Sequence, residues 1–381
     1  MIPHSGIPDD KNSIENNKTK VLLGMSGGTD SSTSALILLE QGYEVIGITF
    51  VFCDGNDHHI ADAASLAERL NIKHIVYDAR EIFKKNILSY FISEYMSGRT
   101  PVPCIKCNNY LKWPLLAKTA DEMGIYYIAT GHYIKTIKRG TVEDEKIYIS
   151  RGNDPDKDQS FFMWGLKPDL LKRIVVPLGS LSKSQVREIA ANKGHKKVAE
   201  KKDSLGVCFC PGDYRDFLKS NVPSGSIKEG YFVDTNGKIL GKHSGYPFFT
   251  VGQRRNLGIH LNKAIFVKEI IAQENKVVIA SGDEMYKTVM YLKEVNVNYP
   301  EDLSSDSANL NYTDPANVAD NTIICRIRYR KQNTPCSVEL LDGNRAKVTF
   351  HEPLNSVAPG QGAAFYKGEI LVGGGIIDYA L

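Results

Sequence analysis

Two kinds of hydrophobic pattern follow one another along the chain. Between residues 20 and 133, short continuous apolar runs alternate with longer stretches in which apolar residues recur at helical spacing. The short runs predict buried strands, and the longer stretches predict amphipathic helices. The predicted strands are residues 21–23, 45–51, 75–77 and 126–130, and the predicted helices begin at Asp30 and span residues 62–70, 82–95 and 115–123. Alternating strands and helices predict a doubly wound α/β domain with a parallel sheet, which binds ligands at the carboxyl ends of its strands.

The pattern changes after Pro177. Residues 182–193 predict one more helix, and the glycine-rich stretch 225–258 with short candidate strands predicts a small central domain. From about Val277, short apolar runs separated by turns predict a C-terminal β-barrel. Its expected strands are residues 276–280, 323–329, 336–341, 346–350, 363–366 and 370–373, and residues 298–321 are expected to form a surface loop. The expected domains are a disordered tail at 1–18, the α/β domain at 19–213, the central domain at 214–280 and the barrel at 281–381.

Composition narrows the class of protein. An apolar fraction of 42% and a charged fraction of 24% are typical of a soluble globular protein. No apolar run approaches the roughly 18 residues of a membrane span, and the polar N-terminal segment contains no hydrophobic signal, so we expect no membrane partner. The net charge of +3 does not by itself indicate a nucleic-acid partner, although it leaves room for local basic faces. Seven cysteines without a secretion signal favour a reducing compartment, and hence the cytoplasm.

The first predicted strand turns through glycines into the first predicted helix. The segment is Gly24-Met25-Ser26-Gly27-Gly28-Thr29-Asp30-Ser31-Ser32. Backbone N–H groups at such a turn bind anions, and the helix dipole favours the same charge. A Walker phosphate loop needs a Lys after the glycines and a dinucleotide fingerprint needs Gly-x-Gly-x-x-Gly, so both are excluded. The pattern resembles the pyrophosphatase loop (PP-loop) of enzymes that split ATP into AMP and pyrophosphate, and Asp30 is a candidate magnesium ligand.

Four of the seven cysteines form two close pairs in turn-rich segments. The pairs are Cys104-x-x-Cys107 and Cys208-x-Cys210. Structural zinc, sulfur transfer between one thiol of each pair, and an iron–sulfur cluster are the three chemistries open to these pairs.

A reactive thiol also needs a neighbouring cation, because a free thiol is only a few per cent ionised at neutral pH. The candidate cations are Arg99, Lys106, Lys201 and Lys202. The other three cysteines are expected to be structural, because buried free thiols behave as small hydrophobes. These are Cys53, Cys325 and Cys336.

The glycine loop and both cysteine segments together resemble the tRNA-specific 2-thiouridylases (the MnmA/TrmU family) over nearly the whole chain. Other segments that carry the resemblance are Gly98-Arg99-Thr100-Pro101, Cys107-Asn108, Ala129-Thr130-Gly131-His132-Tyr133, Asp156-Lys157-Asp158-Gln159-Ser160, Asp203-Ser204, Thr250-Val251-Gly252-Gln253-Arg254-Arg255, Arg328-Tyr329, Pro359-Gly360-Gln361 and Gly373-Gly374-Gly375.

The resemblance implies a reaction. ATP would adenylate the C2 oxygen of the wobble uridine, position 34 of certain tRNAs, and a cysteine persulfide would then supply sulfur with release of AMP. Cys208 would carry the persulfide, received from a sulfur-relay protein or a cysteine desulfurase. Cys107 would be the nucleophile, and the two cysteines would end as a disulfide.

The resemblance also implies binding residues. Those for ATP are Gly24, Met25, Ser26, Gly27, Gly28, Thr29, Asp30, Ser31, Phe50 and Gly131. Those for the anticodon stem-loop of tRNA are Val102, Pro103, Cys104, Lys157, Asp158, Gln159, Arg328 and Tyr329. The basic run at 326–331 supports contact with phosphates.

One segment departs from the family pattern. Where the family has Asn-Pro-Asp, this chain has Val102-Pro103-Cys104, so the Asp expected as general acid or base is missing. A thiol is mostly neutral at pH 7 and replaces a carboxylate base poorly. Two routes stay open, a [4Fe–4S] cluster held by Cys104, Cys107 and Cys208, or the persulfide route with Cys104 as an extra resolving thiol. Outside the family, the loop also fits an ATP-dependent ligase, and the missing Asp fits a tRNA-binding protein without activity.

Overall fold

The computed structural model describes residues 19–55, 57–141, 144–201, 206–259, 261, 264–303, 322–329 and 333–381. The predicted tail at 1–18 and most of the predicted loop at 298–321 lie outside the described residues, as do Lys202, Arg330 and Lys331. Among the described residues, no helix has the length and apolar character needed to cross a membrane.

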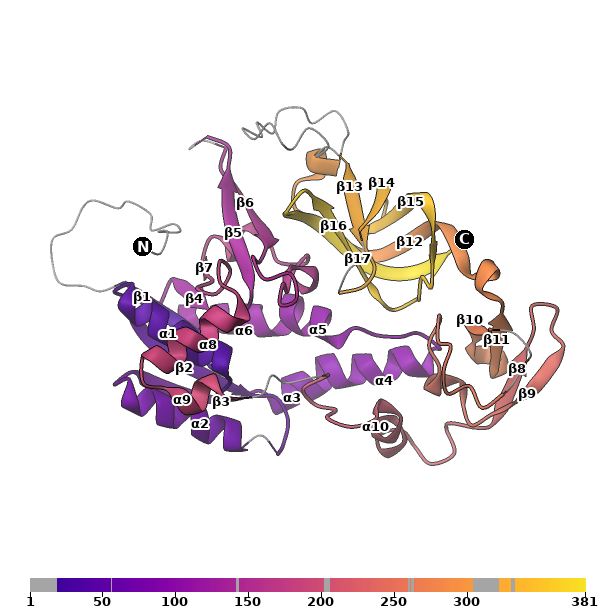
Figure 1. The fold of residues 1–381 in the computed structure, drawn as a ribbon, viewed down its shortest axis with the longest axis horizontal. Helices are drawn as coiled ribbons and strands as arrows, with labels where there is room; N and C mark the ends of the chain where they lie inside the picture. The colour runs from indigo at the N-terminus through magenta and orange to yellow at the C-terminus, as the bar shows by residue number, and fades with distance from the viewer. Residues whose placement is uncertain are drawn as a thin grey trace.

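Five parallel strands form the sheet of the first domain, in the order β3-β2-β1-β4-β7. Side chains of a strand alternate between its faces, and Leu22 of β1 packs with Trp113 in one core while Val21 and Leu23 pack with Leu38 in another. Helices therefore cover both faces (Figure 1), which confirms the doubly wound α/β prediction. The strands are β1 (Lys20–Gly24), β2 (Glu44–Val51), β3 (Lys73–Asp78), β4 (Tyr127–Ala129) and the two-residue β7 (Ile174–Val175), which the pattern did not predict.

The predicted helices are present, with two π-helical turns inserted. The helix predicted at 62–70 already begins at 57, and Ser182 caps the helix predicted at 182–193 through a capping box with Gln185. The helices and helical turns of this domain are α1 (Thr29–Glu40), α2 (Asp57–Arg69), α3 (Arg80–Phe83), η1 (Lys84–Leu88), α4 (Ser89–Met96), α5 (Pro103–Lys106), η2 (Cys107–Lys112), α6 (Trp113–Glu122), η3 (Ser160–Phe162), α7 (Pro168–Leu171), α8 (Lys183–Asn192) and α9 (Lys196–Ala199).

A hairpin of β5 (Ile134–Arg139) and β6 (Lys146–Arg151) leaves the first domain and joins the C-terminal sheet. Leu371 pairs with Ile149 and Ile370 pairs with Ser150, so β6 extends the edge of the barrel (Figure 1). The sequence pattern missed β5 because its apolar residues, Ile134 and Ile137, are three apart and lack the period of two that marks a half-buried strand.

The C-terminal strands form a closed barrel, as predicted. Six strands run in the order β12-β15-β14-β13-β16-β17, and β12 pairs with β17 to close the ring. The long strand β12 escaped prediction because register shifts in its pairings and the positive φ of Glu294 interrupt its alternation. The strands are β12 (Tyr286–Val297), β13 (Ile323–Arg326), β14 (Thr334–Leu341), β15 (Arg345–Asn355), β16 (Gly362–Lys367) and β17 (Ile370–Ala380), and the 3-10 turn η7 (Pro300–Leu303) follows β12.

Between these two parts along the chain lies a small four-stranded unit, with the strand order β10-β11-β8-β9. Phe232, Phe249 and Val267 contribute to its own core. The strand expected at 276–280 as the start of the barrel series belongs to this sheet instead, because it pairs with β8 and β10. The elements are α10 (Tyr214–Asn221), β8 (Gly230–Val233), β9 (Ile239–His243), η4 (Tyr246–Phe248), β10 (Phe266–Ile271), η5 (Ala272–Glu274), β11 (Lys276–Ala280) and η6 (Gly282–Met285).

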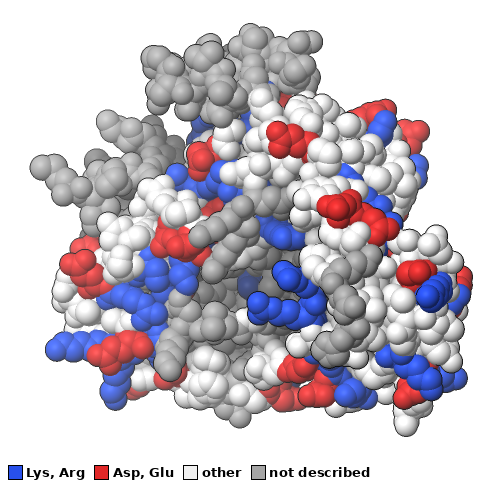
Figure 2. Space-filling model, turned by 45° about the vertical axis from the view of Figure 1, so that its right-hand side comes forward, with Lys and Arg blue, Asp and Glu red and all other residues white. Residues whose placement is uncertain are grey.

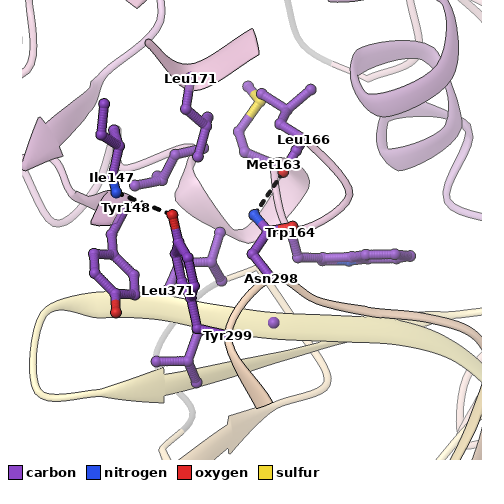
Figure 3. Close-up of a pocket in the computed structure, with 12 residues that line it drawn as sticks. Ile147, Tyr148, Met163, Trp164, Leu166, Leu171, Asn298, Tyr299 and Leu371 are labelled. Carbon is purple, nitrogen blue, oxygen red and sulfur yellow. Dashed lines mark hydrogen bonds between the residues drawn. The ribbon is translucent and has the colours of Figure 1, made fainter. Parts of the chain in front are cut away.

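A small cavity lies where β6, the segment after η3 and the barrel meet (Figure 3). The hydroxyl of Tyr299 accepts a hydrogen bond from the Ile147 amide at 3.1 Å, and Asn298 Nδ2 donates to the Leu166 carbonyl at 2.8 Å. With a volume of about 10 Å³, the cavity has room for about one water molecule. It is a small gap in the packing between domains and is too small for a substrate.

Candidate active site

The glycine loop presents backbone donors at the carboxyl edge of the parallel sheet. Helix α1 begins directly after Gly28, and no side chain caps its N-terminus. Gly27 has a φ of +69°, and a Cβ there would overlap the carbonyl oxygen of His59 at the start of α2. The uncapped amides and the helix dipole make this turn an anion site of nucleotide-phosphate size.

A lysine from a distant helix reaches the same loop. Asp30 Oδ1 accepts from Lys183 Nζ at 2.6 Å and from the Tyr133 hydroxyl at 2.7 Å. Lys183 is the first residue of α8, and its own amide donates to Asp154. Lys183 and the Tyr133 hydroxyl therefore hold the Asp30 carboxylate beside the glycine loop, and its expected role as a magnesium ligand stays a prediction.

The segment around α9 covers the loop. Lys201 Nζ donates to the Gly27 carbonyl and to Asp62 Oδ2, both at 2.5 Å, and Thr29 Oγ1 donates to the Val198 carbonyl at 2.7 Å. Lys201 was expected near the cysteines as their cation. It lies instead against the glycine loop, paired with a carboxylate.

Two other predicted ATP residues lie at the ends of neighbouring strands. A Cβ on Gly131, just after β4, would lie 2.7 Å from the Ser31 nitrogen, so the glycine allows β4 to approach the loop closely. Phe50 in β2 is half-buried, with its ring 5.6 Å from that of Tyr77 and 5.8 Å from that of Phe52. These rings form an apolar wall beside the glycine loop, which suits a flat base.

The structure brings three of the four paired cysteines together. Cys104 lies in α5 and Cys107 begins the π-helical turn η2, while Cys208 lies in an exposed turn at 207–210. Burial, with smaller contributions from the charges of the Cys208 and Cys104 thiolates, raises the pKa of Cys107 to about 11. Cys210 points elsewhere, with its sulfur 3.8 Å from the Gly212 carbonyl. All these cysteines are free thiols.

The three cysteines expected to be structural divide into two groups. Cys325 and Cys336 are buried in the barrel core, as predicted. Cys53 is not in strand-like surroundings: it lies half-buried in a bend after β2, and its sulfur is 4.0 Å from the Cys208 carbonyl oxygen. The apolar run 45–51 ends before Cys53, which is why the pattern placed it wrongly.

The cation beside the thiols is Lys112, which sequence reasoning missed. Burial raises the pKa of Cys104, Cys107 and Cys208, and the charge of Lys112 opposes that rise at all three thiols. Five residues from Cys107 would place it about 140° away around a regular α-helix. In the π-helical turn, whose hydrogen bonds join residues i and i+5, the two residues lie one turn apart.

Two more of the cations expected near the thiols are paired elsewhere, and the fourth, Lys202, lies outside the described residues. Lys106 forms an ion pair with Glu294. Arg99 pairs with Glu94 at 2.9 Å and with Asp378 at 3.2 Å. Both therefore join the first domain to the barrel and do not serve the thiols.

His132 connects the cysteines to the glycine loop. It follows Gly131, is buried, and its ring centroid lies 5.7 Å from that of Trp113, the residue after Lys112. Burial and the Lys112 charge hold the pKa of His132 well below its usual value, so the imidazole is neutral. It shares a 2.6 Å hydrogen bond with Thr130. This is the structural histidine that the sequence suggested.

Most predicted tRNA residues lie where the hairpin, η3 and the barrel meet. The Asp158 carboxylate is buried, accepts from the Gly152 and Ser160 amides at 3.1 Å each, and lies 3.6 Å from Arg326 Nη1. Gln159 Oε1 accepts from the Tyr133 amide at 3.0 Å. These two side chains therefore hold the turn in shape, and Lys157 is half-buried on the same turn.

The remaining predicted tRNA residues are split between two places. Arg328 is exposed just after β13, and the Tyr329 ring lies 4.9 Å from that of Phe162 beside the Asp158 turn. Val102 and Pro103 instead lie at the start of α5, next to the thiols.

Comparisons with known proteins agree with this site. A family model described as the tRNA methyl transferase HUP domain matches residues 19–212, and tRNA-specific 2-thiouridylase MnmA 2 of Phocaeicola vulgatus is 54% identical over 94% of this chain and 97% of that protein. The chain belongs to the MnmA family of tRNA-specific 2-thiouridylases. The resemblance stated from the motifs is thereby confirmed.

Other members of the MnmA family match over similar lengths. MnmA 1 of Bacteroides fragilis is 50% identical over 96% of this chain and 98% of that protein, and MnmA of Amoebophilus asiaticus is 40% identical over 94% and 95%. Models described as the tRNA methyl transferase PRC-barrel domain and the aminomethyltransferase beta-barrel domain match residues 215–281 and 305–377.

Proposed function

We propose that this protein is a tRNA-uridine 2-sulfurtransferase, which uses ATP to thiolate C2 of the wobble uridine. One observation carries the proposal. The glycine loop and the thiols of Cys104, Cys107 and Cys208 are joined at one edge of the parallel sheet through Gly131, His132 and Trp113. An anion site next to paired thiols suits activation of a carbonyl oxygen followed by sulfur transfer.

The first half-reaction makes a leaving group. The uracil C2 oxygen attacks the α-phosphorus of ATP and pyrophosphate departs. The uncapped amides of α1 and the ammonium of Lys183 stabilise the charge that develops on pyrophosphate. Magnesium bound with the nucleotide would screen the phosphate charge, and Asp30, held by Lys183 and Tyr133, is the residue of the loop that would hold it.

The second half-reaction delivers sulfur. The thiolate of Cys107 attacks Sγ of the Cys208 persulfide, which forms a Cys107–Cys208 disulfide and releases hydrosulfide. Hydrosulfide attacks C2 of the adenylated uracil and AMP departs. Two electrons from an external dithiol then reduce the disulfide. The exposed turn that carries Cys208 suits loading by a sulfur-relay protein or a cysteine desulfurase.

The thiols favour this route over an iron–sulfur cluster. Within the part of the chain that the structure describes, no group of three or more His, Cys, Asp or Glu side chains is arranged to hold a metal ion. The arrangement of Cys104, Cys107 and Cys208 therefore does not fit a cluster, and we derive no step through one.

We propose that tRNA lies across the junction of the hairpin and the barrel. Figure 2 shows Lys and Arg side chains gathered near the centre of one face. Exposed Arg328 supports phosphate contact, and a base extruded from the anticodon loop would reach Val102 and Pro103 beside the thiols. Lys157 is proposed as a second contact, with Asp158 and Gln159 holding its turn. A cytoplasmic location suits thiols that must stay reduced.

The thiols also separate this function from two others. Methyl transfer, which the descriptions of two matched family models name, needs no persulfide, and an ATP-dependent ligase needs no paired cysteines. Thiolation uses both the glycine loop, which binds the phosphates of ATP, and the cysteine thiols, which deliver the sulfur.

The test is thiolation of an unmodified anticodon stem-loop by anaerobically purified protein with Mg–ATP and sulfide, before and after iron–sulfur reconstitution. We expect 2-thiouridine, detected by mass spectrometry, together with pyrophosphate release that depends on RNA and an equal rate without iron. Cys208→Ser is assayed with a cysteine desulfurase and cysteine as the sulfur source, and loses activity, whereas the matched variant Cys210→Ser keeps it.

Three outcomes would contradict the proposal. Pyrophosphate release that is independent of RNA would indicate a ligase. No release at all would indicate an inactive tRNA-binding protein. Activity that requires reconstitution, and is lost in Cys104→Ala, would establish the cluster route.

A further inference from the structure

The ammonium of Lys112 occupies an unusual position. The residue is half-buried at the end of η2, and its side-chain ammonium forms no hydrogen bond or ion pair with any residue that the structure describes. A partly buried ammonium without a carboxylate partner costs free energy. A neighbouring anion offsets that cost, so the position calls for an anionic partner that is formed during the reaction.

The neighbours of Lys112 indicate which anion this is. The titratable groups with which its charge interacts are Cys104, Cys107, Cys208 and His132. His132 is neutral and offers no negative charge. The anions available among these side chains are therefore the cysteine thiolates.

The local backbone explains how one lysine serves all these sulfurs. The π-helical turn stacks Lys112 directly over Cys107, and α5 continues into the same helix, which adds Cys104 to that side. The turn that carries Cys208 comes from another part of the chain and meets this face. Insertions of this kind are frequent at functional sites.

We propose that Lys112 is the positioning residue for sulfur transfer: its charge stabilises the thiolate of Cys208 that receives the sulfur and the thiolate of Cys107 that then attacks the protonated persulfide. This rests on the proposed sulfurtransferase function for its purpose, but the electrostatic effect exists in the protein alone. No atom is gained or lost by Lys112. It remains an ammonium while the negative charge moves from the Cys107 thiolate to the released hydrosulfide.

The experiment measures thiol reactivity without tRNA or ATP. Iodoacetamide labelling of each cysteine is followed by peptide mass spectrometry from pH 6 to 10, in the wild-type chain and in Lys112→Met. A nearby cation shifts a thiol pKa by about one unit or more. We expect labelling of Cys208 at pH 7 to fall about tenfold in Lys112→Met and its midpoint to move to higher pH.

Matched controls separate charge from structure. Lys112→Arg keeps the charge and is expected to label within about threefold of wild type. Lys118→Met removes an exposed lysine that pairs with Glu122 on the adjoining helix, and is expected to change nothing. Cys210 is an internal reference, because the Lys112 charge does not contribute to its pKa.

Identical labelling midpoints in wild type and Lys112→Met would overturn the proposal. If Lys112→Met is misfolded by circular dichroism, Lys112→Gln replaces it and the same criterion applies. In the thiolation assay we expect the pH of half-maximal kcat to rise by about one unit while KM for tRNA stays within threefold. A labelling shift without any thiolation would sustain the role of Lys112 and refute the proposed function.

Discussion

Replacing Gly131 by alanine tests how tightly β4 packs against the glycine loop. The new Cβ would lie 2.7 Å from the Ser31 nitrogen and 2.8 Å from the Asp30 carbonyl carbon, where ordinary contacts begin at 3.4 Å. Both atoms are backbone, so the start of α1 must shift by about half an ångström. Overpacking of this kind costs about 1–3 kcal/mol, or about 2–10 °C in Tm for a domain of this size.

The shift should weaken nucleotide binding more than it weakens the fold. A hydrogen bond from an amide to a charged group contributes about 1.5–3 kcal/mol, so one misaligned donor of the loop raises the Kd for ATP about tenfold to a hundredfold. Isothermal titration with ATP and thermal unfolding measure the two effects. Gly282→Ala is the control, because its Cβ would make an ordinary 3.6 Å contact with Phe266. The reasoning is refuted if Gly131→Ala binds ATP within twofold of that control and unfolds at the same temperature.

Two further predictions concern buried groups. Asp158→Asn removes the carboxylate partner of half-buried Arg326 and should lower the free energy of unfolding by about 3–5 kcal/mol in urea titrations; a loss below about 1 kcal/mol would show that the pair is not structural. The raised pKa of Cys107, about 11, means that the folded state holds its proton more tightly than the unfolded chain, so the contribution to stability is complete below pH 9 and lost as pH rises through 11. Compared with Cys107→Ala, the wild-type chain should lose about 1.4 kcal/mol between pH 8 and pH 10, and parallel pH curves for the two proteins would contradict this.

Local patterns were enough to predict the parallel sheet and the glycine loop. Continuous apolar runs such as residues 45–51 identify strands buried on both faces, and the turn before Asp30 needs only adjacent residues. Local patterns could not predict which side chains from distant segments of the chain contact the glycine loop. Lys183 reaches Asp30 from 153 residues away, and nothing in the spacing of either residue indicates the other.

The thiol site shows a second limit of sequence reasoning. Cys104, Cys107 and Cys208 were identified correctly as a group. Arg99, Lys106 and Lys201 were wrong as their cations, because each forms an ion pair with a carboxylate, as Lys106 does with Glu294. Lys112 was not predicted as the cation of the thiols, because a spacing of five residues brings it next to Cys107 only in a π-helical turn. Cys53 was misplaced because the strand before it ends at Val51, as predicted, and Cys53 lies two residues beyond that end in a bend.

The hairpin that joins the barrel sets an order for biosynthesis. Ser150 in β6 bonds to the carbonyl of Glu369, 219 residues later, and β6 pairs only then with β17. During synthesis, the edge of β6 that pairs with β17 therefore stays unpaired until almost the whole chain has left the ribosome. The outer strand β5 carries Lys135, Lys138 and Arg139, charges that discourage pairing of that exposed edge with other chains. A chain that stops short of its last strand leaves its N-terminal domain unfinished as well.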